Sequence, residues 1–561
     1  MIDQIVLKFG ASEGKPPLAI DVTPVTVFVG PNNAGKSRIL IELENFCRRT
    51  RGQANDLLID KVVFTALTRP EIEEELLKIE QKPRGNEALA PGHVIVGRLN
   101  PQANQAFRAQ VNREALIAEA QSPVTCQGHY CTFLSLYTLR LDGTNRLNLL
   151  NEQPAGDLQT TSLNHLAHLF QDNSLRKKVR THVYDAFGKH FVIDPTNVGR
   201  LRVRLSDRAP TTEREEKGWE NDSVSFHKTA VDIRTASDGV RAFTGIITTL
   251  LAGDPKITLI DEPEAFLHPA LASKLGMAVA GSLRQTKKRL FVSTHSASFL
   301  MGCIQAGVAL NIVRLTYNYS SPTARLLPRD KILHLMRHPL LRSTGVLSGL
   351  FYESVVVTEG DADRAFYQEI NERLLACNDP RGIRSCLFIN AQNKQTIWDI
   401  VKPLRELGIP AVGIVDIDVL KEGGQVWSKP LDSAFVPMIS RQAFHDQRQA
   451  IHAALQKTGK DMKRDGGIDL LSGPEREAAE NLLSQLREYG IMVVAKGELE
   501  SWLKPLGATG RTPAWLIDVF QRMGEDTDKA EYVWPGPGDV WDFIGQVNGW
   551  IINPSKKGIP S

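Results

Sequence analysis

The sequence has almost no surplus of charge of either sign. Lys and Arg number 67 and Asp and Glu number 64, which leaves a formal net charge of +3 at pH 7. A surplus this small excludes a protein that binds phosphate backbones over its whole surface. Any surface that binds nucleic acid must therefore be local.

Long hydrophobic runs and cysteines are also scarce. No apolar run approaches the ~18 residues needed to span a bilayer, and residues 1–9 carry charges within a strand-like alternation, unlike a signal peptide. The 6 cysteines in 561 residues are too few for a disulfide framework. We therefore expect a cytoplasmic protein with reduced thiols and no membrane partner.

What the chain does contain is an alternation of strand-like and helix-like segments. Short apolar runs recur, and most are followed by stretches in which apolar residues lie three or four apart. Such alternation is typical of α/β domains built on a parallel sheet. We predict strands at 4–9, 24–30, 256–260, 289–293, 354–358, 387–389, 411–415 and 491–495, and helices at 37–47, 163–187, 239–251, 269–282, 362–375 and 396–407.

The first candidate site is a glycine-rich loop. Residues 30–37 read GPNNAGKS, which fits GxxxxGK[ST], and they lie between a predicted strand and a predicted helix. In such a loop backbone N–H groups and the helix N-terminus bind phosphates, the lysine neutralises phosphate oxygens and the hydroxyl can ligate Mg²⁺. The predicted ATP-binding residues here are Gly30, Asn32, Asn33, Gly35, Lys36 and Ser37.

A partner for this loop is expected at the end of a neighbouring strand. Residues 257–262 end in Asp261, suited to the Mg²⁺ shell together with Ser37, and Glu262, suited to polarising water. The run DEPEAFLHP from Asp261 resembles the extended second nucleotide motif of ABC-type ATPases. His295, in STHS at the end of the next strand, resembles the histidine switch of that class.

The same resemblance implies three further nucleotide contacts and a dimer. Ser237 and Gly239, in SDG at a helix start, take the place of the signature motif, with Ala236 and Asp238 departing from its usual string. Gln153 is the counterpart of the metal-contacting glutamine. A signature serine binds ATP held by a second subunit, so a homodimer or higher homo-oligomer is implied.

A second acidic site is predicted in the C-terminal half. Glu359 follows an apolar strand and precedes a glycine, while Asp416 and Asp418 end another apolar strand. Alternate side chains of a strand point the same way, so the two aspartates can converge on one ion. Oxygen ligands alone suit Mg²⁺ or Mn²⁺.

This acidic pattern resembles the TOPRIM domain of topoisomerases, primases and certain nucleases. With the downstream cluster KGELESWL from Lys496, and with an ABC-type ATPase preceding it, the chain resembles the OLD (overcoming lysogenization defect) nucleases. The resemblance implies Lys496 as a catalytic lysine that offsets phosphate charge, and Glu500 as a metal ligand or a salt-bridge partner. The metal ligands that it implies are Glu359, Asp363, Asp416, Asp418 and Glu498.

The expected fold is therefore α/β: an ABC-type P-loop ATPase head with a helical insertion, followed by a C-terminal TOPRIM α/β domain. We expect the ATPase domain over residues 1–345, its arm or dimerisation insertion at about 68–235, the TOPRIM domain over 350–505 and a helical extension over 506–561. Residues 317–350 are interpreted as a connector. In the insertion, the alternation from Arg200 to Leu205 would line one strand face with guanidinium groups suited to phosphate.

The function expected from this resemblance is an ATPase and metal-dependent endonuclease in bacterial defence against phage. Its cofactors would be ATP and Mg²⁺, with Mn²⁺ as an alternative at the TOPRIM site. Nucleic acid is the expected partner, DNA being favoured over RNA, and a second defence-system protein is a further candidate. Two alternatives stay open: an ATP-gated sensor or scaffold that does not cut, and a chromosome-maintenance repair ATPase, for which the insertion lacks sustained heptads.

Overall fold

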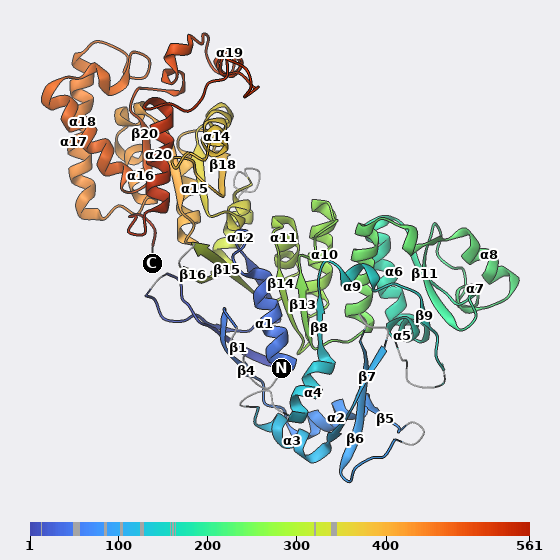
Figure 1. Cartoon of the computed structure of the whole chain (residues 1–561). Helices are drawn as coiled ribbons and strands as arrows, with labels where there is room; N and C mark the ends of the chain where they lie inside the picture. Colours follow the sequence, from blue (N-terminus) through green and yellow to red (C-terminus); the bar gives the residue numbers. More distant parts are fainter. Residues whose placement is uncertain are drawn as a thin grey trace. The chain divides into compact units, whose positions relative to one another are not determined.

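The chain forms two compact units, Met1–Arg329 and Asp330–Ser561 (Figure 1). Each unit has its own sheet and its own hydrophobic core. None of the helices in the described part of the chain is both long and apolar enough to cross a membrane. The computed structural model describes residues 1–12, 14–48, 56–83, 87–100, 105–123, 128–157, 159, 162, 164–318, 321–337 and 345–560.

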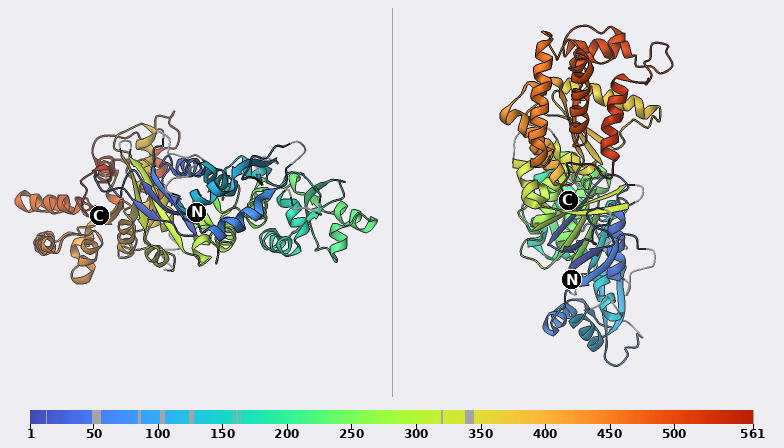
Figure 2. Two further views of the ribbon diagram at one scale, coloured as in Figure 1. Left: turned by 90° about the horizontal axis from the view of Figure 1, so that it is seen from below. Right: turned by 90° about the vertical axis from the view of Figure 1, so that its left-hand side faces the viewer.

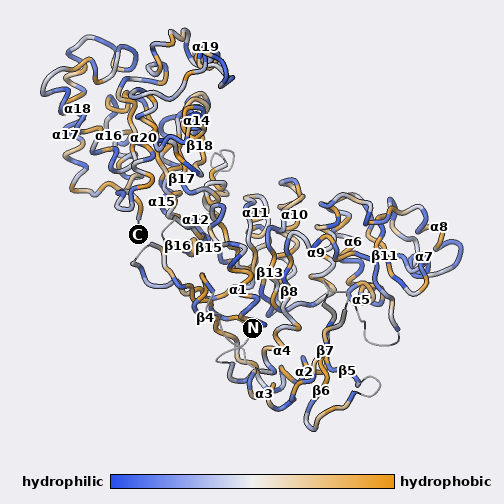
Figure 3. Tube along the Cα trace, viewed as in Figure 1, coloured by the Kyte–Doolittle hydropathy of each residue, from blue (hydrophilic) through white to orange (hydrophobic). Residues whose placement is uncertain are grey.

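A six-stranded sheet is the centre of the first unit. Five strands are parallel and the edge strand β16 is antiparallel. The central strands are buried on both faces, so they are apolar almost throughout, and β13 is coloured mainly hydrophobic in Figure 3. The strand order is β16 (Ser321–Leu327), β15 (Leu310–Asn318), β3 (Val25–Val29), β14 (Arg289–Ser293), β13 (Ile257–Asp261) and β8 (Thr138–Leu141).

The predicted insertion at 68–235 is not a single helical block. It contains two further small sheets as well as helices, and its strand β8 returns to the edge of the central sheet. The pattern of β8 is too short to be recognised as a strand before its parallel partner β13 is known. The residues interpreted as a connector also contain strand structure, because β15 pairs with β3 in the central sheet and then turns back as β16.

The remaining sheets of the first unit are smaller. One is antiparallel and has the strand order β2 (Ala19–Asp21), β1 (Ile2–Leu7), β4 (Ile59–Phe64). A second has the order β5 (Glu80–Gln81), β6 (His93–Asn100), β7 (Gln105–Asn112). The third contains β10 (His190–Asp194), β11 (Arg200–Ser206) and β12 (Val231–Asp232), with β9 (Gln153–Pro154) also paired to β11.

The helices of the first unit pack on these sheets. Helix α1 contacts β8, β13 and β14, and α10 lies along α11. Asp172 caps α6 and separates it from α5, so the predicted helix at 163–187 is two helices. The helices are α1 (Lys36–Arg48), α2 (Arg69–Ile79), α3 (Arg113–Gln121), α4 (Gly128–Tyr137), α5 (His165–Gln171), α6 (Asn173–Phe187), α7 (Glu213–Lys217), α8 (Asn221–Thr229), α9 (Asp238–Ala252), α10 (Pro269–Gly281) and α11 (Ala297–Gln305); α12 (Arg329–Arg337) follows at the boundary of the units.

The second unit is built on a four-stranded parallel sheet. Its order is β18 (Cys386–Asn390), β17 (Ser354–Thr358), β19 (Ala411–Asp416) and β20 (Ile491–Val494), which places β17 beside β19. The helices are α14 (Asp361–Ala376), α15 (Thr396–Glu406), α16 (Gly424–Ser433), α17 (Met438–Lys457), α18 (Gly473–Arg487), α19 (Ala514–Met523) and α20 (Asp539–Ile552).

Residues after 505 belong to the core of this second unit. Trp515 and Trp541 are buried in the same apolar cluster as Val356 of β17 and Phe366 of α14. In both views of Figure 2 the red C-terminal helices lie among the yellow and orange elements of this unit, and α20 contacts α14. The predicted helical extension at 506–561 therefore completes the core around the second sheet.

Candidate functional site

The glycine-rich loop lies between β3 and α1, as predicted. Gly30, Asn33 and Gly35 have φ values of 144°, 62° and 89°. A Cβ on Gly30 would lie 2.0 Å from the carbonyl oxygen of Leu315 in β15. Because only glycine tolerates both this backbone and this approach, the loop is held tightly against the end of the central sheet.

Lys36, the first residue of α1, closes this loop from inside. Its side chain is 5 % exposed, and its Nζ donates to the carbonyl oxygens of Gly30 at 3.0 Å and Pro31 at 2.6 Å. Burial lowers the pKa of Lys36 to about 8, although the nearby carboxylates of Glu262 and Asp261 act in the opposite direction. A buried ammonium bound to carbonyl oxygens alone is a poorly compensated charge, which suits it to an anionic ligand.

Ser37 and Asp261 meet as a ligand pair for Mg²⁺ would. Ser37 Oγ donates to Asp261 Oδ1 at 2.9 Å. Ser293, at the end of β14, donates to the same carboxylate oxygen. A hydroxyl and a carboxylate at the mouth of a phosphate-binding loop form the donor set that Mg²⁺ prefers with a nucleotide.

Glu262 and His295 form the second part of this site. Glu262 has φ of 47°, and its backbone N–H donates to Ser293 O at 2.9 Å. Its Oε1 lies 3.5 Å from Nε2 of His295. Burial and the charge of Lys36 lower the pKa of His295, so the imidazole is neutral at pH 7 and can share a hydrogen bond or a water molecule with the carboxylate.

Two supporting residues were not predicted. Arg146 is 2 % exposed and donates to the backbone oxygens of Asp261 at 3.2 Å and Glu262 at 2.5 Å, which fixes the turn between them. Glu264 Oε1 accepts hydrogen bonds from Thr294 Oγ1 at 2.7 Å and from the backbone N–H of His295 at 2.8 Å. Burial raises the pKa of Glu264.

The remaining predicted nucleotide contacts lie at two places in the first unit. Ser237 is exposed and stands at the N-cap position of α9, where its side chain makes no cap hydrogen bond. A Cβ on Gly239 would lie 2.6 Å from Phe266 O, so this helix begins against the segment that follows Glu262. Gln153, in β9, is 1 % exposed. Its Nε2 lies 3.4 Å from Nε2 of His165, and its Oε1 is buried with no hydrogen-bond partner among the described residues.

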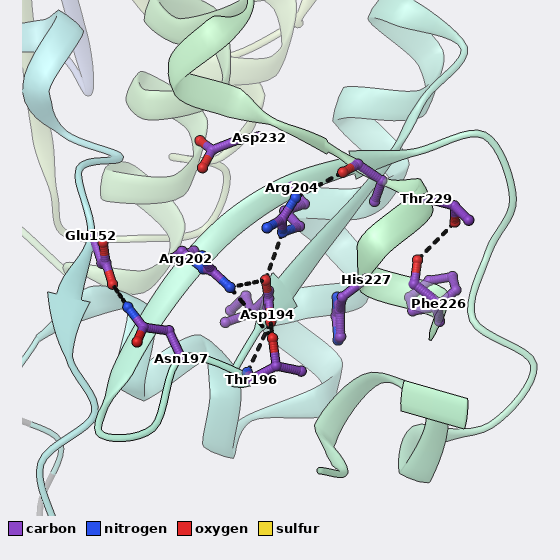
Figure 4. A network of polar contacts seen from close by, with 12 residues as sticks. Glu152, Asp194, Thr196, Asn197, Arg202, Arg204, Phe226, His227, Thr229 and Asp232 are labelled. Carbon is purple, nitrogen blue, oxygen red and sulfur yellow. Dashed lines mark hydrogen bonds and ion pairs between the residues drawn. The ribbon is translucent and has the colours of Figure 1, made fainter. Parts of the chain in front are cut away.

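The arginine stripe on β11 forms, but its charge is neutralised. Arg202 and Arg204 lie 2.9 Å and 2.6 Å from Oδ2 of Asp194, which is fully buried. Figure 4 shows both guanidinium groups directed at this carboxylate. Arg200 is exposed and lies 3.3 Å from Glu152. The prediction that this strand face binds phosphate is therefore wrong for Arg202 and Arg204, whose charges are neutralised by Asp194 of β10.

The acidic residues of the second unit gather at one edge of its sheet. Glu359 follows β17 and Asp416 ends the neighbouring parallel strand β19, so both lie at carboxyl ends on the same edge. Asp418 lies in the short 3₁₀ turn after β19. Burial, then the charges of Asp416 and Asp418, raise the pKa of Glu359; burial and Asp418 also raise the pKa of Asp416, even though a lysine opposes this.

Asp363 and Glu498 extend this carboxylate cluster. Asp363 Oδ2 accepts a hydrogen bond from the backbone N–H of Gly360 at 3.0 Å. Burial raises the pKa of Asp363 to about 7, with Asp416 and Glu359 adding to the effect. Burial and the charges of Glu500 and Asp416 raise the pKa of Glu498. We call Glu359, Asp363, Asp416, Asp418 and Glu498 the carboxylate cluster.

Lys496 and Glu500 make other contacts. Nζ of Lys496 lies 5.9 Å from the ring centroid of Trp502, and its side chain lines a cavity of about 240 Å³ between α18, β20 and α20. Glu500 accepts hydrogen bonds from the backbone N–H and the hydroxyl of Thr512. The sequence left open whether Glu500 is a metal ligand or a salt-bridge partner. In the structure it is instead hydrogen-bonded to Thr512, in the loop that leads into α19.

Two lysines that were not predicted lie in the carboxylate cluster. Lys463 Nζ is 2.8 Å from Asp416 Oδ2 and 3.8 Å from Glu498 Oε2. Lys394 Nζ is 3.3 Å from Asp418 Oδ2 and 2.6 Å from Oε1 of Glu422. Neither lysine stands in a recognisable motif, since each comes from a loop far along the chain from the aspartate that it contacts.

The described residues contain no set of three His, Cys, Asp or Glu side chains already arranged to hold a metal ion. Carboxylates repel one another, and here the ammonium of Lys463 contacts both Asp416 and Glu498. The donor set nevertheless consists of oxygen atoms, which is the chemistry that Mg²⁺ and Mn²⁺ require. The carboxylate cluster thus fits a divalent cation in composition, but its side chains would have to close around one.

Comparisons with known families match both halves of the chain. Residues 157–301 match the family described as "AAA domain, putative AbiEii toxin, Type IV TA system". Residues 350–418 match the family described as "Overcoming lysogenization defect protein-like, TOPRIM domain". The first match includes Asp261, Glu262 and His295, and the second includes Glu359, Asp363, Asp416 and Asp418.

Three individual proteins show low sequence identity to this chain. The Old nuclease of Escherichia phage P2 is 28 % identical over 174 residues, which are 29 % of this chain and 28 % of that protein. The SMC head domain from Thermotoga maritima is 12 % identical, with a TM-score of 0.28, covering 58 % of this chain and 99 % of that one. An SMC head bound to the C-winged helix domain of ScpA is 14 % identical, with a TM-score of 0.33, covering 59 % and 99 %.

The two family matches confirm the predicted order of the domains, an ATPase domain followed by a TOPRIM domain. An AAA-type ATPase domain precedes an OLD-like TOPRIM domain in one chain, which fits an OLD-family ATPase–TOPRIM fusion. Such domains in general use a nucleotide and a divalent metal. The parallel sheet order of both units and the strand–loop–helix at Lys36 agree with this assignment independently of the matches.

Proposed function

We propose that this chain, an AAA-type ATPase domain joined to an OLD-like TOPRIM domain, is an ATP-binding, metal-dependent endonuclease that cleaves nucleic-acid phosphodiester bonds. The observation that carries the proposal is the carboxylate cluster. Glu359 and Asp416 lie at the ends of adjacent parallel strands, and burial, then the charge of Asp416, raise the pKa of Glu359. Acidic groups held together at such a cost are typical of a site that binds cations.

The nucleotide site supports ATP binding and hydrolysis. Lys36 would offset the charge of the phosphates, while Ser37 and Asp261 would hold Mg²⁺. Glu262 would orient the attacking water, and His295, neutral and next to its carboxylate, would hold that water or the terminal phosphate. Arg146 fixes the backbone of this turn and so positions both acids.

Ser237, which is exposed, and Gly239, which is half-buried, lie at the start of α9 and support a second copy as partner. A helix N-terminus with a free hydroxyl binds anions well, so this end of α9 would contact the nucleotide of the other subunit in a homodimer or higher homo-oligomer. Gln153 is buried against His165 in this conformation, and its predicted contact with the nucleotide-bound metal requires the segment around β9 to move.

In the TOPRIM domain the carboxylate cluster would hold Mg²⁺ or Mn²⁺. The bound ions would supply Lewis-acid stabilisation of the attacking and leaving oxygens. The chain's own part is to present oxygen ligands: Glu359 directly after β17, Asp416 at the end of β19, Asp418 in the turn that follows it, and Glu498 in the loop after β20. Asp363 also fixes the turn at Gly360 through its hydrogen bond, and Lys496 is the predicted partner for phosphate charge.

The biological role that we propose is bacterial defence against phage, in the cytoplasm, with DNA favoured over RNA as target. A second defence-system protein remains a proposed partner. The small net charge and the neutralised arginines of β11 mean that nucleic acid would be bound at a local surface near the carboxylate cluster.

The test compares wild type, Lys36→Ala and Asp416→Ala on plasmid, single-stranded DNA and RNA, each with and without ATP and with Mg²⁺ or Mn²⁺. We expect Lys36→Ala to lose ATP binding, measured with a fluorescent nucleotide. Asp416→Ala should bind ATP as wild type does but show no cut strands on gels. Equal cleavage by Asp416→Ala and wild type would rule out the assignment of the cluster.

A second function is favoured by one observation. Lys463 and Lys394 already neutralise Asp416 and Asp418, which is also what a TOPRIM domain without bound metal would need. The chain would then be an ATP-gated sensor or scaffold that controls a partner effector. No cleavage by wild type under any combination of ATP, metal and substrate, together with ATP-dependent dimerisation, would support this alternative.

A further inference from the structure

Lys463 occupies the place of a cation in the carboxylate cluster. Its ammonium lies between Asp416 at 2.8 Å and Glu498 at 3.8 Å. Asp416 is the last residue of β19, and Glu498 lies in the loop that follows the neighbouring strand β20. We propose that Lys463 is a built-in counter-cation that a divalent metal must displace, a role that rests on the proposed metal site and deepens it.

The backbone of Lys463 is held by a compact turn. The backbone N–H of Lys463 donates to Asp461 Oδ1 at 2.8 Å. The backbone carbonyl oxygen of Asp461 accepts a hydrogen bond from the N–H of Asp465 at 2.8 Å. The N–H of Gly467 donates to Met462 O at 3.0 Å. Met462 is buried, so it anchors the turn to the unit. The position from which the lysine side chain starts is thus fixed.

Two glycines bring this turn against the loop that carries Glu498. A Cβ on Gly497, whose φ is 125°, would lie 2.1 Å from Lys463 O, and a Cβ on Gly467, whose φ is 61°, would lie 1.9 Å from Ala495 O. Ile468 N also donates to Ala495 O at 2.9 Å. Each contact requires glycine for the close approach and for the left-handed backbone. The chain is therefore shaped to place Lys463 beside the carboxylate cluster.

Electrostatics explain what the ammonium does there. Opposite charges at these distances attract one another more strongly when they are partly buried than when water surrounds them. The Lys463 side chain is 31 % exposed and that of Asp416 14 %, so the attraction is only partly screened. A divalent ion bound by Asp416 and Glu498 would need the same space and would be repelled by the ammonium. Metal binding must therefore break these contacts and move the flexible lysine side chain.

Lys394 does not have the same position. Its shorter contact is with Glu422, at 2.6 Å, and its distance from Asp418 is 3.3 Å. Glu422 is not one of the predicted metal ligands, so Lys394 can keep its ion pair with Glu422 when Asp418 binds a metal ion. Lys463, whose two contacts are both predicted ligands, loses its partners on metal binding. The competition is therefore assigned to Lys463.

The experiment measures Mn²⁺ affinity by electron paramagnetic resonance of free Mn²⁺ in the nucleotide-free full chain. All proteins carry Asp261→Asn, so that the nucleotide site contributes no ion. Lys463→Met should bind Mn²⁺ about tenfold more tightly than its parent, a difference of about 1.4 kcal/mol. Lys460→Met removes an exposed lysine close to the same turn and should bind as the parent does. Lys463→Gln serves if the methionine variant does not fold, as judged by its circular dichroism.

The outcomes separate this inference from the proposed function. Loss of Mn²⁺ binding in Asp416→Asn shows that the bound ion requires Asp416. If such binding is found but its affinity in Lys463→Met equals that of the parent or is weaker, the inference is overturned and the metal site remains supported. No Asp416-dependent binding in any protein, Lys463→Met included, overturns both. Binding that becomes measurable or tighter on removal of Lys463 and is unchanged by Lys460→Met supports both.

Discussion

Replacing Lys36 by methionine should stabilise the nucleotide-free protein while abolishing its response to ATP. The ammonium is buried, and burial lowers its pKa from 10.5 to about 8. A shift of this size corresponds to roughly 3 kcal/mol of unfavourable folding free energy when the group is charged. Hydrogen bonds to Gly30 O and Pro31 O are lost in the variant, which leaves an expected net gain of about 1 to 2 kcal/mol.

The pH dependence has a definite sign. Below pH 8 the lysine is protonated in both the folded and the unfolded state, so wild type carries the full cost. Between about pH 8 and 10.5 the folded state binds fewer protons than the unfolded state, and the stability of wild type rises toward that of the variant. The gain from Lys36→Met should therefore be largest at pH 7, vanish at about pH 9 and change sign by about pH 10, because the roughly 3 kcal/mol that wild type regains exceeds the net gain.

Urea unfolding of the first unit, followed by circular dichroism at pH 7 and pH 10, measures this difference. Wild type should gain about 2.7 kcal/mol with MgATP at one hundred times its dissociation constant, and Lys36→Met should gain nothing. A variant less stable than wild type at pH 7 without nucleotide would refute the account of Lys36 as a poorly compensated charge.

Three further changes have clear structural expectations. Burial lowers the pKa of Arg405 to about 9, so its charge is costly to bury, but its guanidinium makes four hydrogen bonds where Lys36 makes two, to the backbone oxygens of Ala411, Tyr489, Gly490 and Gly558. Arg405→Met leaves all four oxygens without this donor, at about 1 to 3 kcal/mol each, which exceeds the relief of the buried charge, so the unfolding free energy of the second unit in urea should fall by about 3 kcal/mol. Asp194→Asn leaves the two arginines of β11 without their carboxylate and should cost about 3 kcal/mol in the same assay on the first unit. Gly497→Ala should lower the melting temperature of the second unit because its φ of 125° and its 2.1 Å contact exclude a Cβ, whereas Gly536→Ala, with open space around it, should leave the melting temperature unchanged.

The parts of the fold that were predicted correctly are those whose signals are local. The apolar runs at β3, β13, β14, β17 and β19 stand between glycine, proline or charged residues, and each is a buried parallel strand. A strand buried on both faces has to be apolar along its whole length, so the run itself predicts the element. Strand β8 and the hairpin of β15 and β16 lack such runs or caps, and their pairing partners decided their structure.

The residues that sequence reasoning missed act through distant partners. Arg146 contacts backbone oxygens 115 and 116 residues further along the chain. Backbone oxygens leave no trace in the sequence, so no motif could have indicated this contact. Lys463 and Lys394 likewise stand in loops of mixed polarity, where a lysine normally indicates a solvated surface.

Two interpretations failed for a related reason. The arginines of β11 lie on one strand as predicted, but no local pattern indicates that Asp194 of the paired strand β10 is buried and binds two of them. Residues 506–561 were assigned to a separate extension because no motif matches them. Their tryptophans bury against β17 and α14, and burial of aromatic side chains is a property of the packed structure rather than of a local pattern.

A crystal structure of the full chain with ATP and Mn²⁺, in which anomalous scattering locates the ions, would show whether the carboxylate cluster holds divalent metal. We expect one anomalous peak at Ser37 and Asp261, which serves as the internal control, and at least one within bonding distance of both Glu359 and Asp416. Manganese at the nucleotide site, with no peak in the carboxylate cluster and Lys463 still bound to Asp416, would contradict this expectation.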